Sequence, residues 1–392
     1  APPMRYTFID NVILGSINMD RLQEAIDALQ DQGEHFAESD LYAEALDLMA
    51  DDPVAFSVVN VEPLLEMFVG TMTESFEYMM EEVPDLDAIM DVLGMADMRT
   101  LVASAEFRDD AVASIDAVLL MDERQGLFTL IPDQPVTFEA PSFVPDDAMS
   151  FSASVVDFTA LLPLAEEIID VLPAEMADTF TMQLQTARQM VGPFFEAIGP
   201  EVVNWTTLQR PLQADSERGT YAIRITDDLV VQNSVSLLAN LGGLDARDFE
   251  GGVIYESEFG GPTLGIGGNW LFIGDAQRVE DALRADGAPR VREGDEPLRP
   301  FHDADARVVG VIDLGAMLEM EYYAMEHEVE NLRAQWKEMG FEDEDIEMFL
   351  EGYEATDMSE VPPLECLLDH LSELSTTMHA EDGAIRIRMI VH

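Results

Sequence analysis

Basic residues are scarce in this sequence, and lysine is almost missing. The chain of 392 residues has 20 Lys and Arg against 79 Asp and Glu, which gives a formal net charge of -59. Lys337 is the sole lysine. Phosphate backbones and anionic lipid surfaces attract proteins through Lys and Arg. An average surface of this composition repels both, so we expect no nucleic acid among the partners.

The excess of acid works against folding. Like charges repel one another in the compact state, and salt screens that repulsion beyond about 8 Å at physiological ionic strength. Two interpretations stay open: adaptation to a saline medium, or a surface that binds cations or a basic partner. We predict that the stability of the fold rises with salt.

Cysteine and long apolar runs are also lacking. Cys366 is the single cysteine, so no disulfide forms within the chain. No run approaches the roughly 20 apolar residues of a membrane-spanning helix. The sequence begins with "APPM" at Ala1, as a chain cleaved after a small residue does. We therefore predict an extracytoplasmic protein (periplasmic, cell-surface or secreted) without a transmembrane segment, after signal-peptide removal.

Motifs of catalysis and specific ligand binding are missing as well. The chain has no G-x-S-x-G elbow for a nucleophilic serine. The stretch "GIGGNWLFIG" from Gly265 leads into an apolar strand and has no lysine, unlike a phosphate-binding loop. Cys366 and His370 are too few to make a metal site, and "FEDEDIEMFLEGYE" from Phe341 lacks the central glycine of an EF-hand. We expect no catalytic residue, no cofactor and no specific metal site, only loosely bound divalent cations.

What the sequence does have is a repeated pattern in a composition that is 47% hydrophobic, enough to fill sizeable cores. A turn that runs into a short β-forming stretch occurs as "DDPVAFSVV" from Asp51, "VPDDAMSFSAS" over 144–154 and "DADARVVGVI" from Asp303. Each stretch reaches a residue of the helix-capping type. These residues are Asn60, Asp157 and Asp313.

The segments after these caps repeat apolar residues with the 3.6 period of an amphipathic helix. Glycine-led strands, "GTYAIRIT" from Gly219 and "GAIRIRMIV" from Gly383, follow the second and third. We predict the fold class α+β, with repeated β-α-β-β units, mainly antiparallel sheets and long amphipathic helical arms. The predicted organisation is a detached hairpin-helix tail piece, unit 1, unit 2 with an extra hairpin-helix tail, and unit 3, over residues 1–50, 51–143, 144–300 and 301–392.

The two ends of the chain differ in a way that suggests how they meet. The third unit stops after its "AIRIRMIV" strand, which predicts an open edge, and open edges pair with other strands. The segment from Arg5 to Leu29 contains a strand pair and a helix, and an isolated hairpin is marginally stable. We predict that Val12 to Leu14 pair with residues 376–391 of the same chain or of a neighbouring molecule.

Four motifs of this chain resemble those of a family of secreted or envelope-associated bacterial repeat proteins of unknown function. That family repeats a "VPADA"-like turn with an apolar strand, a "D-[LF]-x-x-L" helix start and a "G-W-L-x-x-G" strand before a short helix. The matching stretches are "VPDDAMSF", "DFTALL", "DLGAML" and "GGNWLFIGDAQRVEDAL". The resemblance implies a repeat architecture and secretion. It implies no reaction and no site residues.

Methionine is abundant: the chain has 23, and seven of them lie in the first helical arm, between Met67 and Met98. Methionine side chains pack adaptably in cores, line apolar grooves for partners and can bind Cu(I) through sulfur. All three interpretations stay open. The residues that we predict for an apolar groove are Met67, Met72, Phe76, Met79 and Met90.

Taken together, these features favour binding over catalysis. We predict a non-enzymatic extracytoplasmic protein that works by binding or assembly with a protein partner or with its own copies. One form of this hypothesis is a subunit of a larger envelope or surface complex. The alternative is a carrier or chaperone-like protein that holds a lipid or an apolar peptide in the Met-rich groove. A metal-assisted hydrolase is the third hypothesis.

Overall fold

The computed structural model describes most of the chain. The described residues are 5–9, 12–16, 40–49, 53–79, 83–132, 143–145, 147–213, 216–257, 261–285, 305–350, 353, 356, 358–359, 361–381 and 383–392. They contain 11 α-helices, α2 to α12, and two antiparallel sheets. The prediction of a mixed α+β protein with mainly antiparallel strands is therefore confirmed.

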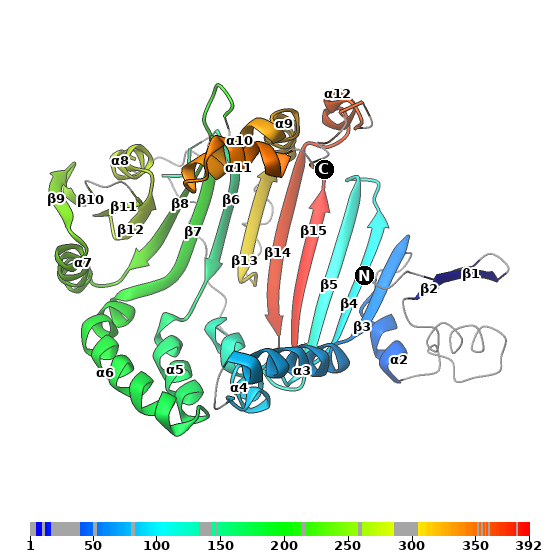
Figure 1. Cartoon of the computed structure of the whole chain (residues 1–392), viewed down its shortest axis with the longest axis horizontal. Coiled ribbons are helices and arrows are strands. Elements are labelled where there is room, and N and C mark those ends of the chain that lie inside the picture. Colours follow the sequence, from blue (N-terminus) through cyan, green and yellow to red (C-terminus); the bar gives the residue numbers. More distant parts are fainter. Residues whose placement is uncertain are drawn as a thin grey trace.

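The larger sheet has 13 strands, all paired antiparallel (Figure 1). From one edge to the other the strands are β3 (Ala55–Asn60), β4 (Met98–Phe107), β5 (Ala113–Met121), β15 (Ala384–Val391), β14 (Glu373–Glu381), β13 (Val308–Asp313), β6 (Ala148–Val155), β7 (Ile198–Leu208), β8 (Glu217–Ile225), β12 (Trp270–Gly274), β11 (Thr263–Gly267), β10 (Gly252–Ser257) and β9 (Leu244–Phe249). The smaller sheet pairs β1 (Arg5–Ile9) with β2 (Val12–Ser16).

Antiparallel pairing throughout the sheet decides where the helices lie. β3 and β6 run in one direction and β13 runs in the other, so the chain leaves β3 and β6 at one end of the sheet and β13 at the opposite end. The helices that follow are found accordingly at opposite ends (Figure 1). At one end lie α3 (Glu62–Met79), α4 (Leu86–Val92), α5 (Leu161–Asp170) and α6 (Ala174–Ala197), and at the other α9 (Leu314–Glu326), α10 (Glu328–Glu338), α11 (Asp343–Leu350) and α12 (Leu364–Leu368).

The three predicted capping residues start helical segments, as their chemistry requires. The side chain of Asp313 accepts a hydrogen bond from the N–H of Ala316 at 2.9 Å. Asp157 accepts one from Thr159 at 3.0 Å, and the Asn60 amide oxygen lies 3.3 Å from the nitrogen of Glu62. A side-chain oxygen here satisfies a backbone donor that has no partner within the helix. These local predictions are confirmed.

The main core lies where helices cover both faces of β6 to β12. Buried residues of the sheet on one face pack with Val279 and Ala282 of α8 (Ala276–Arg284). On the other face, Val231 and Val235 of α7 (Asp228–Gly242) pack against Leu271 and other buried residues. This half of the sheet is therefore enclosed between two helical layers.

The predicted closure of the chain by its N-terminal strands is wrong for the described residues. Val12 to Leu14 pair with β1 and not with residues 376–391. β15 instead pairs over its whole length with β5, and β14 lies between β15 and β13. β5 offers a full-length antiparallel partner, so the edge expected after the last strand is closed by the first group of strands. The predicted N-terminal helix, from Asp20 to Leu29, lies outside the described residues.

Candidate interaction site

The strand β3 forms one edge of the large sheet and leaves half of its backbone groups without a strand partner. It pairs only with β4 among the described strands. The N–H of Val61 donates to the carbonyl of Arg99 at 2.9 Å, which sets the alternation of the ladder. The backbone groups of Val59 and Ser57 therefore face β4, and those of Val58 and Phe56 point away from the sheet.

The side chains of this edge do not prevent another strand from pairing with it. The six residues "AFSVVN" carry no charge, and the Phe56 side chain is 53% exposed. Natural edge strands usually carry charge, proline or a bulge, because an unprotected edge pairs with other chains. β3 has none of these features.

The opposite edge of the sheet, β9, carries charged residues. Its sequence "LDARDF" has three charged residues in six positions. Arg247 binds Glu256 at 2.8 Å and Glu280 of α8 at 2.6 Å, and its guanidinium lies over the ring of Phe249. The hydrogen bond from Arg247, followed by one from Arg284, holds the pKa of Glu280 below its ordinary value. This edge is charged and fixed to the helix behind it.

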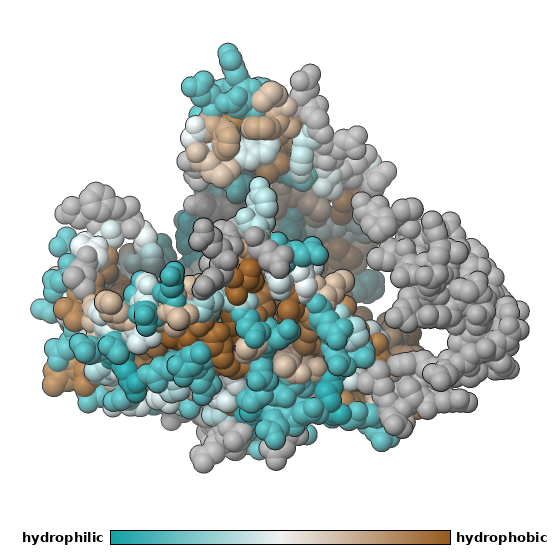
Figure 2. Space-filling view, turned by 60° about the horizontal axis from the view of Figure 1, so that its bottom comes forward, coloured by the Kyte–Doolittle hydropathy of each residue, from teal (hydrophilic) through white to brown (hydrophobic). Residues whose placement is uncertain are grey.

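Exposed apolar side chains lie close to the β3 edge. α3 contacts β4 and presents Leu64, Met67 and Phe68 to solvent, while Phe107 at the end of β4 is 73% exposed. Figure 2, which shows the end of the sheet that carries α3 to α6, places a separate group of hydrophobic residues in the middle of the view, over these helices and away from the β3 edge. Exposed apolar surface of this kind commonly marks an interaction site.

The residues predicted for a Met-rich groove are brought only partly together. Met67 is 65% exposed on α3, Met72 and Phe76 are half-buried on the same helix, and Met90 is buried on α4. Met79 ends α3, and its side chain lies outside the described residues. The α3–α4 contact places the five residues on neighbouring helices, but neither of the two cavities described next includes them.

An apolar cavity of about 410 Å³ lies between α5 and α6. Its lining includes Ile168, Leu172, Phe180 and Leu184. The sequence signal for its α5 side was present, because Ile168 and Leu172 belong to the apolar face of a 3.6-period helix. Periodicity alone does not distinguish a face that packs in a core from one that opens as a groove.

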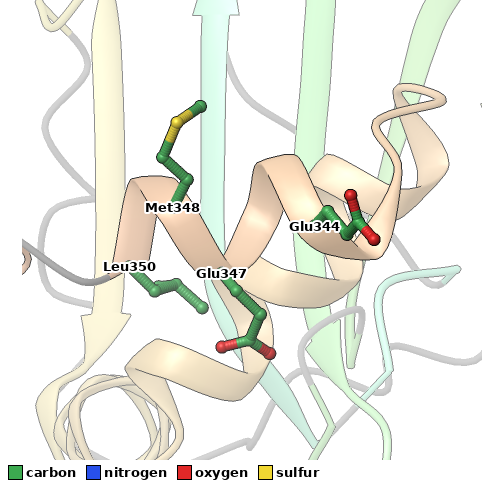
Figure 3. A pocket seen from close by; sticks show the side chains of 4 residues that line it. All are labelled: Glu344, Glu347, Met348 and Leu350. Carbon is green, nitrogen blue, oxygen red and sulfur yellow. The ribbon is translucent and has the colours of Figure 1, made fainter.

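A second cavity, of about 520 Å³, lies at α11 and combines acidic with apolar residues (Figure 3). The carboxylates of Glu344 and Glu347 leave the helix in different directions, and Met348 points away from both. Glu347 is bound to Arg333 of α10. Within the described part of the chain, no group of three or more His, Cys, Asp or Glu is placed to hold a metal ion.

The comparisons with known proteins add little to this picture. No protein-family model and no curated protein matches the chain. Among solved structures, crystal form III of TP0453 is similar at 9% identity and a TM-score of 0.32, over 64% of this chain and 79% of that chain. Crystal form I gives 10% identity and a TM-score of 0.30, over 64% and 78%. Such low scores carry no functional argument, and the reasoning below rests on the surfaces of this chain.

No α-helix in the described part of the chain is both long enough and apolar enough to span a membrane.

Proposed function

We propose that this is a non-enzymatic extracytoplasmic protein that works by binding or assembly through the open edge of its sheet at β3. The observation that carries the proposal is the contrast between the two edges. β3 is uncharged and exposed, whereas β9 carries three charges and is held to α8 through Arg247. Selection against edge pairing explains the second pattern but not the first.

The proposal includes a repeat architecture. The groups β3–β5, β6–β8 and β13–β15 are each three neighbouring strands, with helices between the first and the second strand. We interpret them as copies of one β-α-β-β unit that join edge to edge. Units that add to one another in this way leave an open edge at the end of the row, and β3 is such an edge.

The partner that we propose is a second copy of the chain. An uncharged strand can pair with its own copy about a two-fold axis, which buries the same patch on both subunits. The charge of -59 on each copy opposes this approach at low salt. Because screening shortens from about 10 Å at 0.1 M to about 3 Å at 1 M salt, association strengthens as salt rises.

Sedimentation of wild type, Val58→Pro and Val58→Thr in low and high NaCl tests this function. The N–H of Val58 points away from β4, so proline removes the outer donor without breaking the existing ladder. Threonine keeps both the N–H and the β-branched shape. We expect salt-dependent dimers of the wild type and of Val58→Thr, and at least about tenfold weaker dimers of Val58→Pro, equivalent to about 1.4 kcal/mol.

Two results of that experiment would contradict the proposal. One is a wild type that stays monomeric at every salt and protein concentration. The other is a Val58→Pro variant that dimerises as tightly as Val58→Thr, because the contact would then lie away from the β3 edge.

The apolar cavity between α5 and α6 favours a second candidate function, that of a carrier for a lipid or an apolar peptide. Its volume of about 410 Å³ lies within the range of about 300–1,000 Å³ of small-molecule sites. Binding of a fluorescent fatty acid, measured with wild type and Leu172→Glu, tests this function. A carrier requires saturable binding that the glutamate abolishes, and equal binding by both proteins would contradict it.

A further inference from the structure

The helices α10 and α11 expose large apolar side chains at the end of the sheet that carries α9 to α12 (Figure 1). Among the described elements, α11 packs on α10, and α10 packs in turn on α9. Four apolar side chains on and around these helices are between 43% and 60% exposed; they are Met339, Phe341, Met348 and Phe349. The fold therefore leaves much of the apolar surface of this helix pair in contact with water.

The side of α11 that faces α10 is well packed. Ile346 is fully buried, and the ring of Phe349 lies edge-on to that of Trp336 on α10, with 5.5 Å between the ring centroids. Met348 of the same helix is 60% exposed and lines the cavity at α11. Contacts other than that of Met348 thus hold α11 in place, and its side chain is available to a partner.

Acidic side chains surround this apolar surface. Two of the five acids over 342–347 are bound to basic residues of α10: Asp343 lies 3.0 Å from Lys337, and Glu347 is bound to Arg333. The other three are exposed and have no ion pair with the described residues; they are Glu342, Glu344 and Asp345. The surface therefore carries negative charge that the protein itself does not balance.

The cavity at α11 combines both properties (Figure 3). Carboxylates of Glu344 and Glu347 line it together with Met348 and Leu350. Lysine and arginine side chains have an apolar stem and a cationic end, and they commonly lay the stem along apolar surface. The lining matches such a side chain, with Glu344 as the carboxylate that has no cation partner among the described residues.

We propose that this surface, formed by Met339, Phe341, Glu344, Met348 and Phe349 and called here the α11 face, binds a basic amphipathic helix of a partner protein. Apolar residues of such a helix contact the methionines and phenylalanines, and its basic residues reach Glu344 and the neighbouring acids. Amphipathic helices commonly bind apolar surfaces in this way, and methionine adapts to the shape of a partner. The α11 face is separate from the β3 edge.

Charge complementarity selects this occupant over two others. A second copy of the chain brings the same acids, and like charges oppose its approach. Anionic lipid surfaces bind basic segments and are repelled by acidic ones. A basic helix is attracted by the same charge and can neutralise the three unpaired acids.

Synthetic peptides of about 18 residues, or about five helical turns, test the proposal with the full chain. The first peptide has leucine on one face and lysine on the other. The second has glutamate in place of lysine, and the third has serine in place of leucine. Tryptophan fluorescence gives a local signal, because Trp205 and Trp270 are buried in the main core and Trp336 packs against the α11 face.

A matched pair of variants separates the α11 face from the charge of the whole molecule. Glu344→Gln with Met348→Gln removes one carboxylate and one exposed methionine from α11. Glu175→Gln with Met182→Gln is the control, because it removes the same groups from exposed positions on α6, at the other end of the sheet. Far-ultraviolet circular dichroism and the melting temperature establish that each variant is folded.

We expect the leucine–lysine peptide to bind wild type and the α6 control equally, with a change in Trp336 fluorescence, and the α11 variant at least about tenfold more weakly. Neither of the other peptides should produce this change. Equal binding by the two variants would overturn the proposal, because the total charge would then explain the binding. Equal binding of the serine peptide would also overturn it, because the apolar contacts would then be unnecessary.

The other occupants give different results. A change in Trp336 fluorescence with phosphatidylcholine vesicles but not with the peptide would assign the α11 face to a lipid. Self-association that is lost in the α11 variant and kept in the α6 control would assign it to a second copy. Either result would overturn the proposal.

Discussion

The two edges of the large sheet both carry unpaired backbone groups, but their side chains differ. β9 ends one side with charged residues, and Arg247 ties it to α8. β3 ends the other side with an uncharged strand whose outward backbone groups have no strand partner among the described residues. The same chain protects one edge and leaves the other unprotected.

This difference shows that an open edge is not a consequence of the overall composition. An acidic chain with 79 Asp and Glu has ample charge to place on β3, yet its six positions contain none. Charge at an edge prevents pairing at little cost to the fold. We interpret the absence of charge at β3 as a feature of the proposed interaction surface, and the following predictions test that interpretation.

The largest effect is expected from exchanging the character of the two edges. Val58→Lys gives β3 a charge that dimerisation must bury or place close to its copy. We therefore expect dimers at least about tenfold weaker, a loss of about 1.4 kcal/mol in the free energy of association.

Asp245→Ser with Asp248→Ser removes charge from β9. A molecule with two open edges should form chains longer than dimers, because such contacts propagate unless they close.

Sedimentation in high salt checks both variants. The control is Glu321→Ser with Glu326→Ser on α9, which removes the same two charges at exposed positions away from either edge. If this control forms chains as readily as the β9 variant, net charge and not edge protection governs assembly.

The next effect concerns the whole molecule, because acidic residues are spread over both halves. We expect the melting temperature to rise by several degrees from low salt to about 1 M NaCl, where screening shortens to about 3 Å. Calorimetry at low protein concentration separates this effect from dimerisation. A melting temperature that stays constant or falls with NaCl would contradict it.

A smaller and local effect is expected at the helix that supports β9. A methyl group on Gly265 of β11 would lie 2.4 Å from Cγ1 of Val279 on α8. Because a valine side chain has little rotamer freedom, Gly265→Ala should displace α8 and destabilise the protein by about 1–3 kcal/mol. Urea unfolding measures this change, and hydrogen exchange should place it at β9 to β12 and not at β3.

Gly219→Ala on β8 is the matched control, because no atom lies within 4 Å of the added methyl group. Equal destabilisation by both variants would mean that the contact with α8 does not support this half of the sheet.

The smallest effect is the response of β9 to acid. The pKa of Glu280 is lowered by the hydrogen bond from Arg247, so this bond contributes stability that is complete above the ordinary carboxyl pKa of about 4.3. The contribution is lost as the pH falls through the lower pKa of the folded state. Hydrogen exchange of β9 should therefore quicken below about pH 4, with no such step at β3, which has no carboxylate. Arg247→Gln should remove the step, and a step that persists in this variant would have another cause.

The parts of the fold that depend on neighbouring residues could be predicted from the sequence. The caps at Asn60, Asp157 and Asp313 follow from residue type, because each bond reaches only two or three residues along the chain. The antiparallel α+β class follows from short β-forming stretches separated by amphipathic helices. The alternation in "AIRIRMIV" likewise marks β15 as a strand.

The candidate sites were predicted less well. The Met-rich stretch includes α3, but its composition does not indicate that Met90 is buried while Met67 is exposed. Periodicity identifies an apolar face without identifying what covers it. The uncharged character of β3 was visible in "AFSVVN", but only the order of strands makes this segment an edge.

The sequence by itself determined the acidity, the positions of the caps, the amphipathic helices and the strand-forming segments, because each depends on residue type and local spacing. Tertiary structure alone decided which strands meet. The bond between Arg388 and Asp116 joins residues 272 positions apart, and β15 pairs with β5 instead of the N-terminal strands. Backbone hydrogen bonds are the same for every sequence, so the choice of neighbour depends on the complete set of strands that compete for an edge. That competition leaves β3 without a second strand partner among the described residues and places β15, with Arg386 and Arg388, in the middle of the sheet.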